Sequence, residues 1–212
     1  MDAMERQKLL DSLRKDIGSP QALCLLGSDE RYVDIKLRSS GSLMLDIALG
    51  GGYPYGRLVE ISGAESAGKT TLVNLAIAEA QISEPDKECA IIDIEQSYNM
   101  EWAKSLGVDI NRLFFSQPDT YAENVFEMVD KMIDTGKFAI IAVDSAAGLI
   151  LKEEFEEGDW EKSSRVGGTA GLMTKAMRKL VYSGKLTKSE TTLIFTNQLR
   201  DKIGGFSMYG TR

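Results

Sequence analysis

Apolar residues recur along the chain with two periods that alternate. Short, almost wholly apolar runs predict strands at residues 58–61, 88–94, 113–116, 138–143 and 191–196. Between them, apolar residues at helical spacing predict helices at 71–82 and 121–135. Strands that alternate with helices of this length predict right-handed βαβ units and a parallel sheet flanked by helices. The predicted fold class is therefore α/β.

The first part of the chain has a different pattern. It predicts one amphipathic helix over residues 3–17, with an apolar stripe formed by Leu9, Leu10, Leu13 and Ile17. The α/β pattern begins at residue 40, so we divide the chain into an N-terminal helix and linker, residues 1–39, and a core, residues 40–212. This apolar stripe must pack against another surface, and the pattern leaves open whether that surface belongs to the same domain or to a neighbouring subunit.

A glycine-rich sequence joins the first core strand to its helix. Residues 63–70 read GAESAGKT and fit G-x-x-x-x-G-K-[ST] between a strand and a helix, which predicts a phosphate-binding loop rather than a chance turn. The curled backbone directs N–H groups at phosphate oxygens, and the helix adds its positive dipole end. We expect Lys69 to reach the β- and γ-phosphates and Thr70 to hold Mg²⁺. The predicted nucleotide-binding residues here are Gly63, Glu65, Ser66, Ala67, Gly68, Lys69, Thr70 and Thr71.

Polar residues follow the other strands, where a parallel sheet binds its ligands. Asp144 ends an apolar strand and is predicted to bind the metal, either directly or through water, with helix N-capping as the alternative. Glu95 is predicted to orient the attacking water, and Asp93 is its rival. Gln198 is predicted to sense the γ-phosphate, with an ordinary polar strand end as the alternative.

Composition narrows the chemistry. The 212 residues are enough for one sizeable α/β domain, and they contain no histidine, which excludes Ser-His-Asp triads and His-ligated zinc. Two cysteines, Cys24 and Cys89, fit no metal spacing and are expected to be buried thiols. No apolar run approaches the roughly 20 residues of a membrane span, and the charged start is unlike a signal peptide, so we expect a cytoplasmic protein.

Charge is distributed unevenly. The net charge is −7, yet residues 162–188 contain seven bases and no acid, directly after the acidic run 153–161. A locally basic segment with a Gly-Gly loop suits a nucleic-acid backbone, although basic runs are also common on solvated faces.

Taken together, these sequences resemble the bacterial RecA recombinase family over nearly the whole chain. The resemblance rests on GSLMLDIALG, GRLVEISGAESAGKTT, IIDIEQ, KSLGVD, SQPDT, AVDSAAGL, AMRKL and LIFTNQLRDKIG. It implies a RecA-like P-loop NTPase fold and an N-terminal helix that packs on the adjacent protomer. It also implies ATP and Mg²⁺ as cofactors, a helical homo-oligomeric filament on single-stranded DNA, and pairing of that strand with homologous double-stranded DNA.

The resemblance also implies roles for individual residues. Glu95 is similar to the catalytic glutamate, Asp144 to the second Mg²⁺ ligand, and Gln198 to the residue that couples the γ-phosphate to DNA. Asn99 and Trp102 stand where the family places an Asp and a stacking Tyr against adenine. The implied DNA-binding residues are Arg165, Val166, Gly167, Gly168, Thr174, Arg178, Arg200, Lys202 and Ile203.

Some positions depart from the family pattern. Val166 stands where the family usually has a Met that inserts between bases, and Gly171 stands where it usually has an Arg that binds DNA. Asp201 replaces a residue that makes an apolar contact. We therefore expect the DNA affinity or the step geometry of the DNA to differ. The resemblance also places Arg212 inside the second DNA loop, before the later strands, the lysines that cross to the neighbour's ATP and the C-terminal domain. A second chain that supplies the missing half is one explanation, and a shortened or naturally short form is another.

The leading functional hypothesis is a DNA-dependent ATPase that forms recombination filaments and promotes strand exchange. The alternative is an ATP-binding, non-hydrolysing form that joins or modulates recombinase filaments and needs a second chain for activity. A ring helicase or signalling ATPase of the same fold is a third reading, which the LRDKIG sequence disfavours.

Overall fold

The computed structural model describes residues 1–18, 23–25, 35–152 and 168–198. The chain divides into two compact units, Met1–Lys36 and Leu37–Arg212. The division lies three residues before the boundary that the sequence suggests, and the functional separation of residues 1–39 from 40–212 stays a prediction. No helix in the described ranges is long and apolar enough to cross a membrane.

The first unit contains the predicted amphipathic helix, α1, Ala3–Ile17. Its start is fixed by a capping box, in which the Glu5 backbone N–H donates to Asp2 Oδ1 (2.8 Å) and the Asp2 N–H donates to Glu5 Oε2 (3.0 Å). It ends at Gly18, which has the left-handed conformation that favours glycine. Leu10 is buried, whereas the rest of the stripe is exposed, so what covers it stays a prediction.

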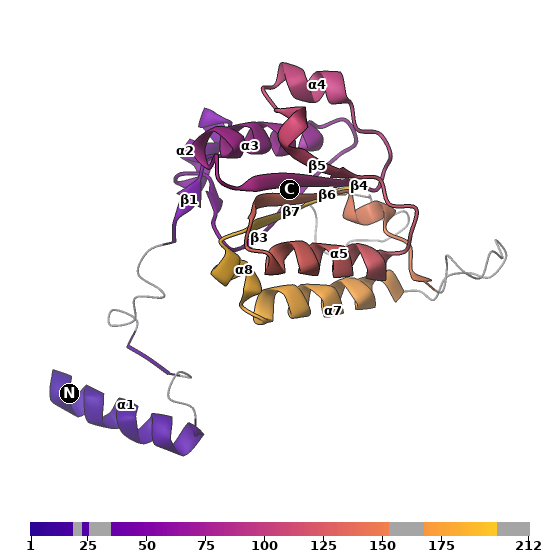
Figure 1. Ribbon diagram of the computed structural model, residues 1–212. Helices are drawn as coiled ribbons and strands as arrows, with labels where there is room; N and C mark the ends of the chain where they lie inside the picture. The colour runs from indigo at the N-terminus through magenta and orange to yellow at the C-terminus, as the bar shows by residue number, and fades with distance from the viewer. Residues whose placement is uncertain (19–22, 26–34, 153–167, 199–212) are drawn as a thin grey trace, which may run out of the picture. The chain divides into compact units, whose positions relative to one another are not determined.

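The second unit is built on a parallel sheet, as predicted (Figure 1). Its strand order among the described residues is β3-β7-β6-β4-β5. The strands are β3 Leu58–Gly63, β4 Glu88–Asp93, β5 Leu113–Ser116, β6 Phe138–Asp144 and β7 Thr192–Gln198. A short antiparallel pair, β1 Leu37–Arg38 and β2 Tyr53–Pro54, precedes it.

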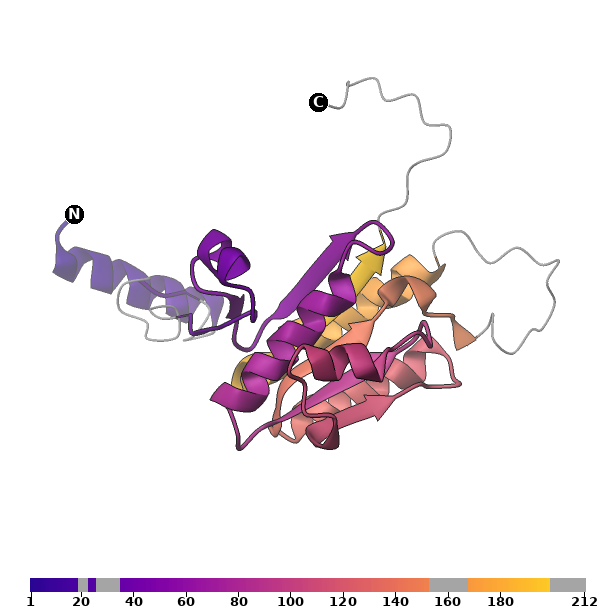
Figure 2. The ribbon, with the colours of Figure 1, turned by 90° about the horizontal axis from the view of Figure 1, so that it is seen from above.

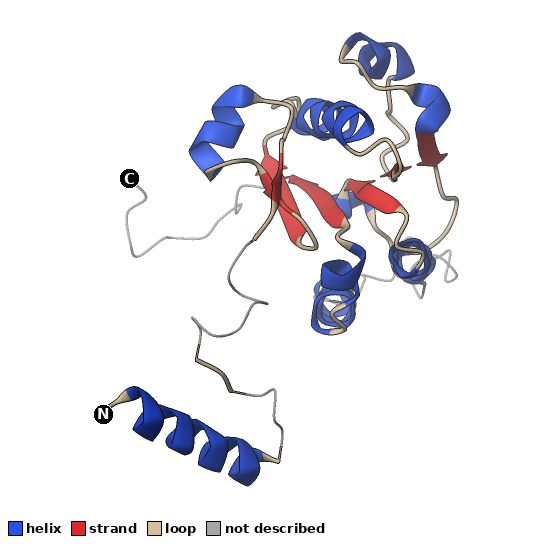
Figure 3. Ribbon diagram, turned by 60° about the vertical axis from the view of Figure 1, so that its left-hand side comes forward, coloured by secondary structure: helices blue, strands red, loops and turns tan. Residues whose placement is uncertain are grey.

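Helices cover both faces of this sheet (Figure 3). One side carries α2 Leu43–Leu49, α3 Lys69–Ser83, α4 Met100–Ser105 and the 3₁₀ helix η3 Ile110–Arg112 (Figure 1). The other carries α5 Ala122–Asp134, α7 Gly168–Tyr182 and α8 Lys185–Ser189, and the 3₁₀ helix η4 Ala146–Gly148 follows β6. The two-sided covering explains why the strands are apolar without strict alternation.

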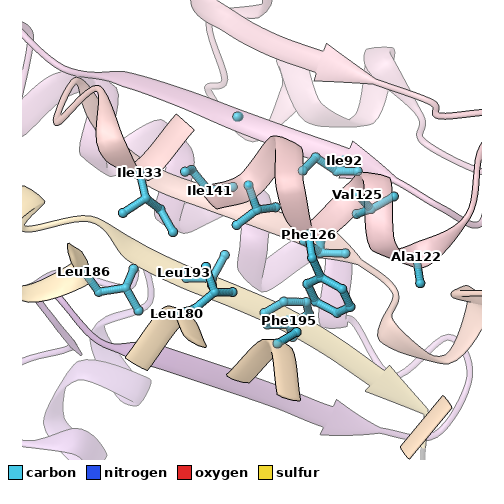
Figure 4. Packing of buried hydrophobic residues seen from close by; sticks show 14 of the residues in the cluster. Ile92, Ala122, Val125, Phe126, Ile133, Ile141, Leu180, Leu186, Leu193 and Phe195 are labelled. Atoms are coloured by element: carbon cyan, nitrogen blue, oxygen red, sulfur yellow. The ribbon is translucent and has the colours of Figure 1, made fainter. Parts of the chain in front are cut away.

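The central strand β6 shows how the two cores are divided. All of its residues are buried. Ile140 and Ala142 belong to the cluster that includes the apolar face of α3. Ile141 and Val143 belong to the cluster formed with α5, α7 and α8, where Ile141 lies near Leu193 of the neighbouring strand (Figure 4). Close packing on both sides fixes the strand and therefore the position of Asp144 at its end.

The thiol predictions are met in part. Cys89 lies in β4 with no exposed surface, and burial raises the pKa of its thiol to about 12, so it stays protonated and packs as a small apolar side chain. Cys24 is only partly buried.

A carboxylate on α5 ties the helices of the second face together. Asp130 accepts from Lys185 Nζ at Oδ1 (2.8 Å) and pairs with Lys179 Nζ at Oδ2 (2.9 Å), and its side chain is 11% exposed. Lys185 also donates to Asp134 Oδ2 (2.8 Å). Burial acts to raise the pKa of Asp130, but the hydrogen bonds from Lys185 and Lys179 outweigh it and leave the pKa below its ordinary value.

We expect Asp130→Asn to lower the free energy of unfolding at pH 7 by about 2 kcal/mol, because a paired, mostly buried carboxylate is lost. Since the folded-state pKa is depressed, this contribution is complete above the unfolded pKa of about 4 and disappears as pH falls through the folded value. Urea unfolding of the variant and the wild type at pH 7 measures the loss of unfolding free energy, and the same comparison at pH 3 measures how much of it disappears. Glu127→Gln, which breaks an exposed pair with Lys131, is the control and should unfold like the wild type. An equal loss for Asp130→Asn at the two pH values would contradict the ion-pair account.

Candidate nucleotide-binding site

The glycine-rich loop joins β3 directly to α3. The chain runs to the tip of β3, turns, and returns over the sheet as α3 (Figure 2). Gly68, the residue before the helix, has φ 90°, and Ser66 has φ 57°, so the loop uses left-handed conformations where it curls. The 15-residue helix therefore begins at Lys69, with its positive dipole end at the loop.

Lys69 lies over this loop. Its ammonium donates to the carbonyl oxygens of Ala64 (2.8 Å) and Gly63 (3.2 Å). The ammonium group is thus held at the open side of the phosphate loop, next to the backbone N–H groups at the start of α3. This arrangement is chemically suited to binding an anion.

Asp144 is oriented by hydroxyl groups from two other elements. Thr70 Oγ1 donates to Oδ2 (2.6 Å), and Thr196 Oγ1 of β7 donates to Oδ1 (2.5 Å). The N-cap position of the 3₁₀ helix that follows is Ser145, whose side chain makes no capping hydrogen bond. The Asp144 carboxylate is bonded to Thr70 and Thr196, so it does not have the N-capping role that was its alternative. A carboxylate and a hydroxyl side by side are oxygen ligands of the kind that Mg²⁺ prefers.

Glu95 connects the ends of three strands. Its Oε1 accepts from Ser145 Oγ (2.5 Å), which follows β6, and from Gln198 Nε2 (3.1 Å), the last residue of β7. The rival carboxylate, Asp93, is 2% exposed and accepts from the Tyr98 backbone N–H (3.0 Å) and from Gln117 Nε2 (2.9 Å). Asp93 is therefore engaged in holding the backbone, while Glu95 is exposed.

A cavity of about 360 Å³ gathers most of these groups. Its lining consists of Glu65, Ser66, Ala67, Gly68, Lys69, Thr70, Thr71, Glu95, Ser97, Asp144 and Gln198. Of the residues predicted from the sequence for nucleotide, metal and catalysis, Gly63, Asn99 and Trp102 do not line it. Three residues were not predicted: Ser97 in the lining, and Ser145 and Thr196, which donate to Glu95 and Asp144 of the lining.

Asn99 and Trp102 lie at the start of α4. Asn99 caps the helix, because its Oδ1 accepts from the Trp102 backbone N–H (2.9 Å). The Trp102 indole Nε1 donates to Thr71 Oγ1 (3.3 Å), and the side chain is 49% exposed. The indole is thus fixed beside the phosphate loop with a large exposed surface.

The residues of this cavity fit Mg²⁺ and a nucleoside triphosphate. In the described ranges, no group of three or more His, Cys, Asp or Glu side chains forms a metal cage. Mg²⁺ normally keeps several water and phosphate ligands and takes one or two carboxylates from the protein. Thr70 and Asp144 supply the small oxygen donor set that such a phosphate-bound ion requires.

The predicted DNA-binding residues are only partly described. Gly168 begins α7, and Thr174 and Arg178 lie exposed on this helix, four residues apart and therefore on one side of it. The other positions, Arg165, Val166, Gly167, Arg200, Lys202 and Ile203, lie outside the described residues.

Comparisons with known proteins identify relatives of this chain. The family model of the RecA N-terminal domain matches residues 5–211. Protein RecA of Mesoplasma florum is 44% identical over 196 residues, covering 92% of this chain and 56% of that protein. Protein RecA of Azospirillum lipoferum is 43% identical over 96% of this chain and 56% of its own length, and that of Wigglesworthia glossinidia brevipalpis is 46% identical over 93% and 57%. The chain thus spans little more than half the length of these relatives.

A solved structure is similar in fold. The crystal structure of the RadB recombinase has a TM-score of 0.55 at 24% identity, covering 76% of this chain and 70% of that chain. This likeness supports the parallel sheet with helices on both faces.

Proposed function

The chain belongs to the RecA family, and on that premise we propose that it is a DNA-dependent ATPase that forms helical filaments on single-stranded DNA and promotes homologous pairing and strand exchange. The observation that carries the proposal is the meeting of Lys69, Asp144 and Glu95 at one edge of the sheet, around a single cavity. A phosphate loop, a metal carboxylate and a water-orienting carboxylate are the groups that nucleotide hydrolysis requires.

Each residue has a proposed task. The curled loop and Lys69 hold the triphosphate, and Thr70 and Asp144 hold Mg²⁺, which when bound neutralises charge on the phosphates. Thr196 keeps the Asp144 carboxylate turned towards Thr70. Both hydrogen bonds that Glu95 accepts from described residues go to Oε1, so Oε2 is placed to orient a water and accept its proton.

Gln198 is proposed to transmit the state of the nucleotide. Its amide donates to Glu95 (3.1 Å) and can instead donate to a phosphate oxygen. It is the last residue of β7, two positions before Arg200, where the residues proposed to bind DNA resume. An exchange of the hydrogen-bond partner of the Gln198 amide would therefore act directly on that segment.

DNA is proposed to bind through the basic part of the chain. Thr174 and Arg178 on α7 contact the DNA backbone in this proposal, together with Arg165 to Gly168 in one loop and Arg200, Lys202 and Ile203 in another. The apolar stripe of α1 is proposed to dock on a neighbouring protomer in the filament.

A second candidate is an ATP-binding form that does not turn over by itself and needs a second chain. It is favoured by one observation: among the described residues that line the cavity, Lys69 is the only base. In that case the residues of the cavity would still bind ATP, but hydrolysis would depend on groups from elsewhere.

The test is ATP hydrolysis with and without single-stranded DNA. We expect DNA to stimulate hydrolysis, and DNA affinity to fall roughly 20-fold between about 50 and 200 mM salt if three basic side chains contact phosphates. Hydrolysis that is indifferent to DNA would contradict the leading proposal. ATP binding without hydrolysis, alone or with DNA, would support the second candidate.

A further inference from the structure

We propose that Tyr98, held between Asp93 and Asn74, is a positioning residue that fixes the Trp102 indole beside the phosphate loop and so determines the part of ATP affinity that comes from the base. The inference rests on the proposed binding of ATP in this cavity. It assigns the base side of the site to a structural clamp that is separate from the phosphate loop.

Tyr98 is the anchor of an otherwise exposed segment. Residues 95–97 and 99–100, which lead from β4 to α4, are exposed, and Tyr98 in their middle is partly buried. Its backbone N–H donates to Asp93 Oδ2 (3.0 Å), and its hydroxyl donates to Asn74 Oδ1 (2.8 Å). The ring lies against Phe115 of β5, with the centroids 5.2 Å apart. The path of the segment is therefore set by this one side chain and its partners.

Both hydrogen-bond partners belong to rigid elements. Asp93 is the last residue of β4 and is 2% exposed, and Asn74 is 1% exposed on α3. Burial, together with the negative charge of Asp93, raises the pKa of Tyr98 to about 12. The phenol thus remains protonated across the neutral range and continues to donate to Asn74.

The clamp leads directly to the indole. Asn99, the residue after Tyr98, caps α4 by accepting from the Trp102 N–H (2.9 Å), and the indole then donates to Thr71 Oγ1 (3.3 Å). Thr71 and Asn74 are three residues apart on α3, so they are neighbours on one side of that helix. The segment is consequently attached to the same side of α3 at two points, one through Tyr98 and one through Trp102.

This arrangement has a consequence for binding. An aromatic face that is held in one orientation loses less entropy on stacking than one that must be ordered by the ligand. Trp102 is 49% exposed, which leaves a surface for a base to stack on. Loosening Tyr98 should therefore weaken recognition of the base without changing the grip on the phosphates.

The experiment compares two ligands by calorimetry: ATP, and inorganic tripolyphosphate, which has no base. Tyr98→Phe removes only the hydroxyl, and we expect the Kd for ATP to rise about fivefold, the effect of one hydrogen bond, with the Kd for tripolyphosphate unchanged. Asn74→Leu should act in the same way. The double variant should bind ATP no more weakly than either single variant, because the two side chains form one interaction. Tyr182→Phe, at a side chain that is 84% exposed, is the matched control and should bind both ligands like the wild type.

Other outcomes overturn the inference. An equal loss of affinity for both ligands would mean that the substitution damages the whole site, and unchanged ATP affinity would mean that the clamp has no part in binding. A wild-type protein that binds neither ligand would overturn the proposed function itself, and this inference with it.

Discussion

Replacing Lys69 with alanine is expected to raise the Kd for ATP by two orders of magnitude or more. The Lys69 ammonium lies at the mouth of the loop, and its described hydrogen bonds are to the Gly63 and Ala64 carbonyls. Charge-assisted hydrogen bonds to two phosphates are worth about 1.5–3 kcal/mol each, so their joint loss corresponds to roughly 100-fold or more. Calorimetric titration with Mg²⁺ and ATP measures the change.

The control for Lys69→Ala is Lys131→Ala, which removes a 74% exposed lysine from α5 on the other face of the sheet. It should bind ATP like the wild type. Because Lys69 bonds only to its own loop among the described residues, Lys69→Ala should also keep the wild-type melting temperature in the absence of nucleotide. Wild-type ATP affinity in Lys69→Ala would show that the loop does not hold the triphosphate.

Glu95→Gln is expected to lower the rate of ATP hydrolysis by about 100-fold or more, the usual contribution of a positioned general base. ATP affinity should stay near that of the wild type, since the amide keeps the size of the carboxylate. Steady-state turnover at saturating ATP, in the presence of single-stranded DNA, measures the first quantity, and calorimetry measures the second. The split between turnover and affinity distinguishes a catalytic from a structural role.

Glu127→Gln on α5 is the matched control for this change, because its carboxylate is exposed and pairs only with Lys131 among the described residues. It should turn over like the wild type. If Glu95→Gln hydrolysed ATP at the wild-type rate, the water-orienting group would have to be sought elsewhere.

The strands of the parallel sheet and helices α3 and α5 were predicted from the sequence, because each is a local pattern. The apolar run that ends at Asp144 is typical of a strand buried on both faces, and β6 is such a strand. The order β3-β7-β6-β4-β5 was not predicted, because which strands pair depends on contacts between distant segments. The same holds for the tie between α5, α7 and α8 through Asp130, which joins residues about 50 positions apart.

The site was predicted where its chemistry follows a strand end. Asp144, Glu95 and Gln198 each stand at the end of a predicted strand, and they line one cavity with the phosphate loop. Thr196 was missed because it reads as an ordinary strand position, and its value depends on the pairing of β7 with β6. A hydroxyl at the end of the apolar run, directly before Asn197 and Gln198, was the available signal.

Two further residues were missed for a similar reason. Ser145 follows Asp144 and belongs to no motif in the sequence, yet it donates to Glu95, fifty positions away. Tyr98 was passed over because its partners, Asp93 and Asn74, are on different elements. Only the fold brings these groups together, so spacing along the chain could not have identified them.

A triphosphate held by residues 63–70 is the feature from which every proposed activity follows, and crystallography tests it most directly. We expect crystals grown with Mg²⁺ and a non-hydrolysable ATP analogue to show the phosphates within the curl of the loop, with Lys69 and Thr70 in contact with them. A map in which the loop is empty at saturating analogue, or in which the analogue lies away from Lys69, would contradict the proposed function.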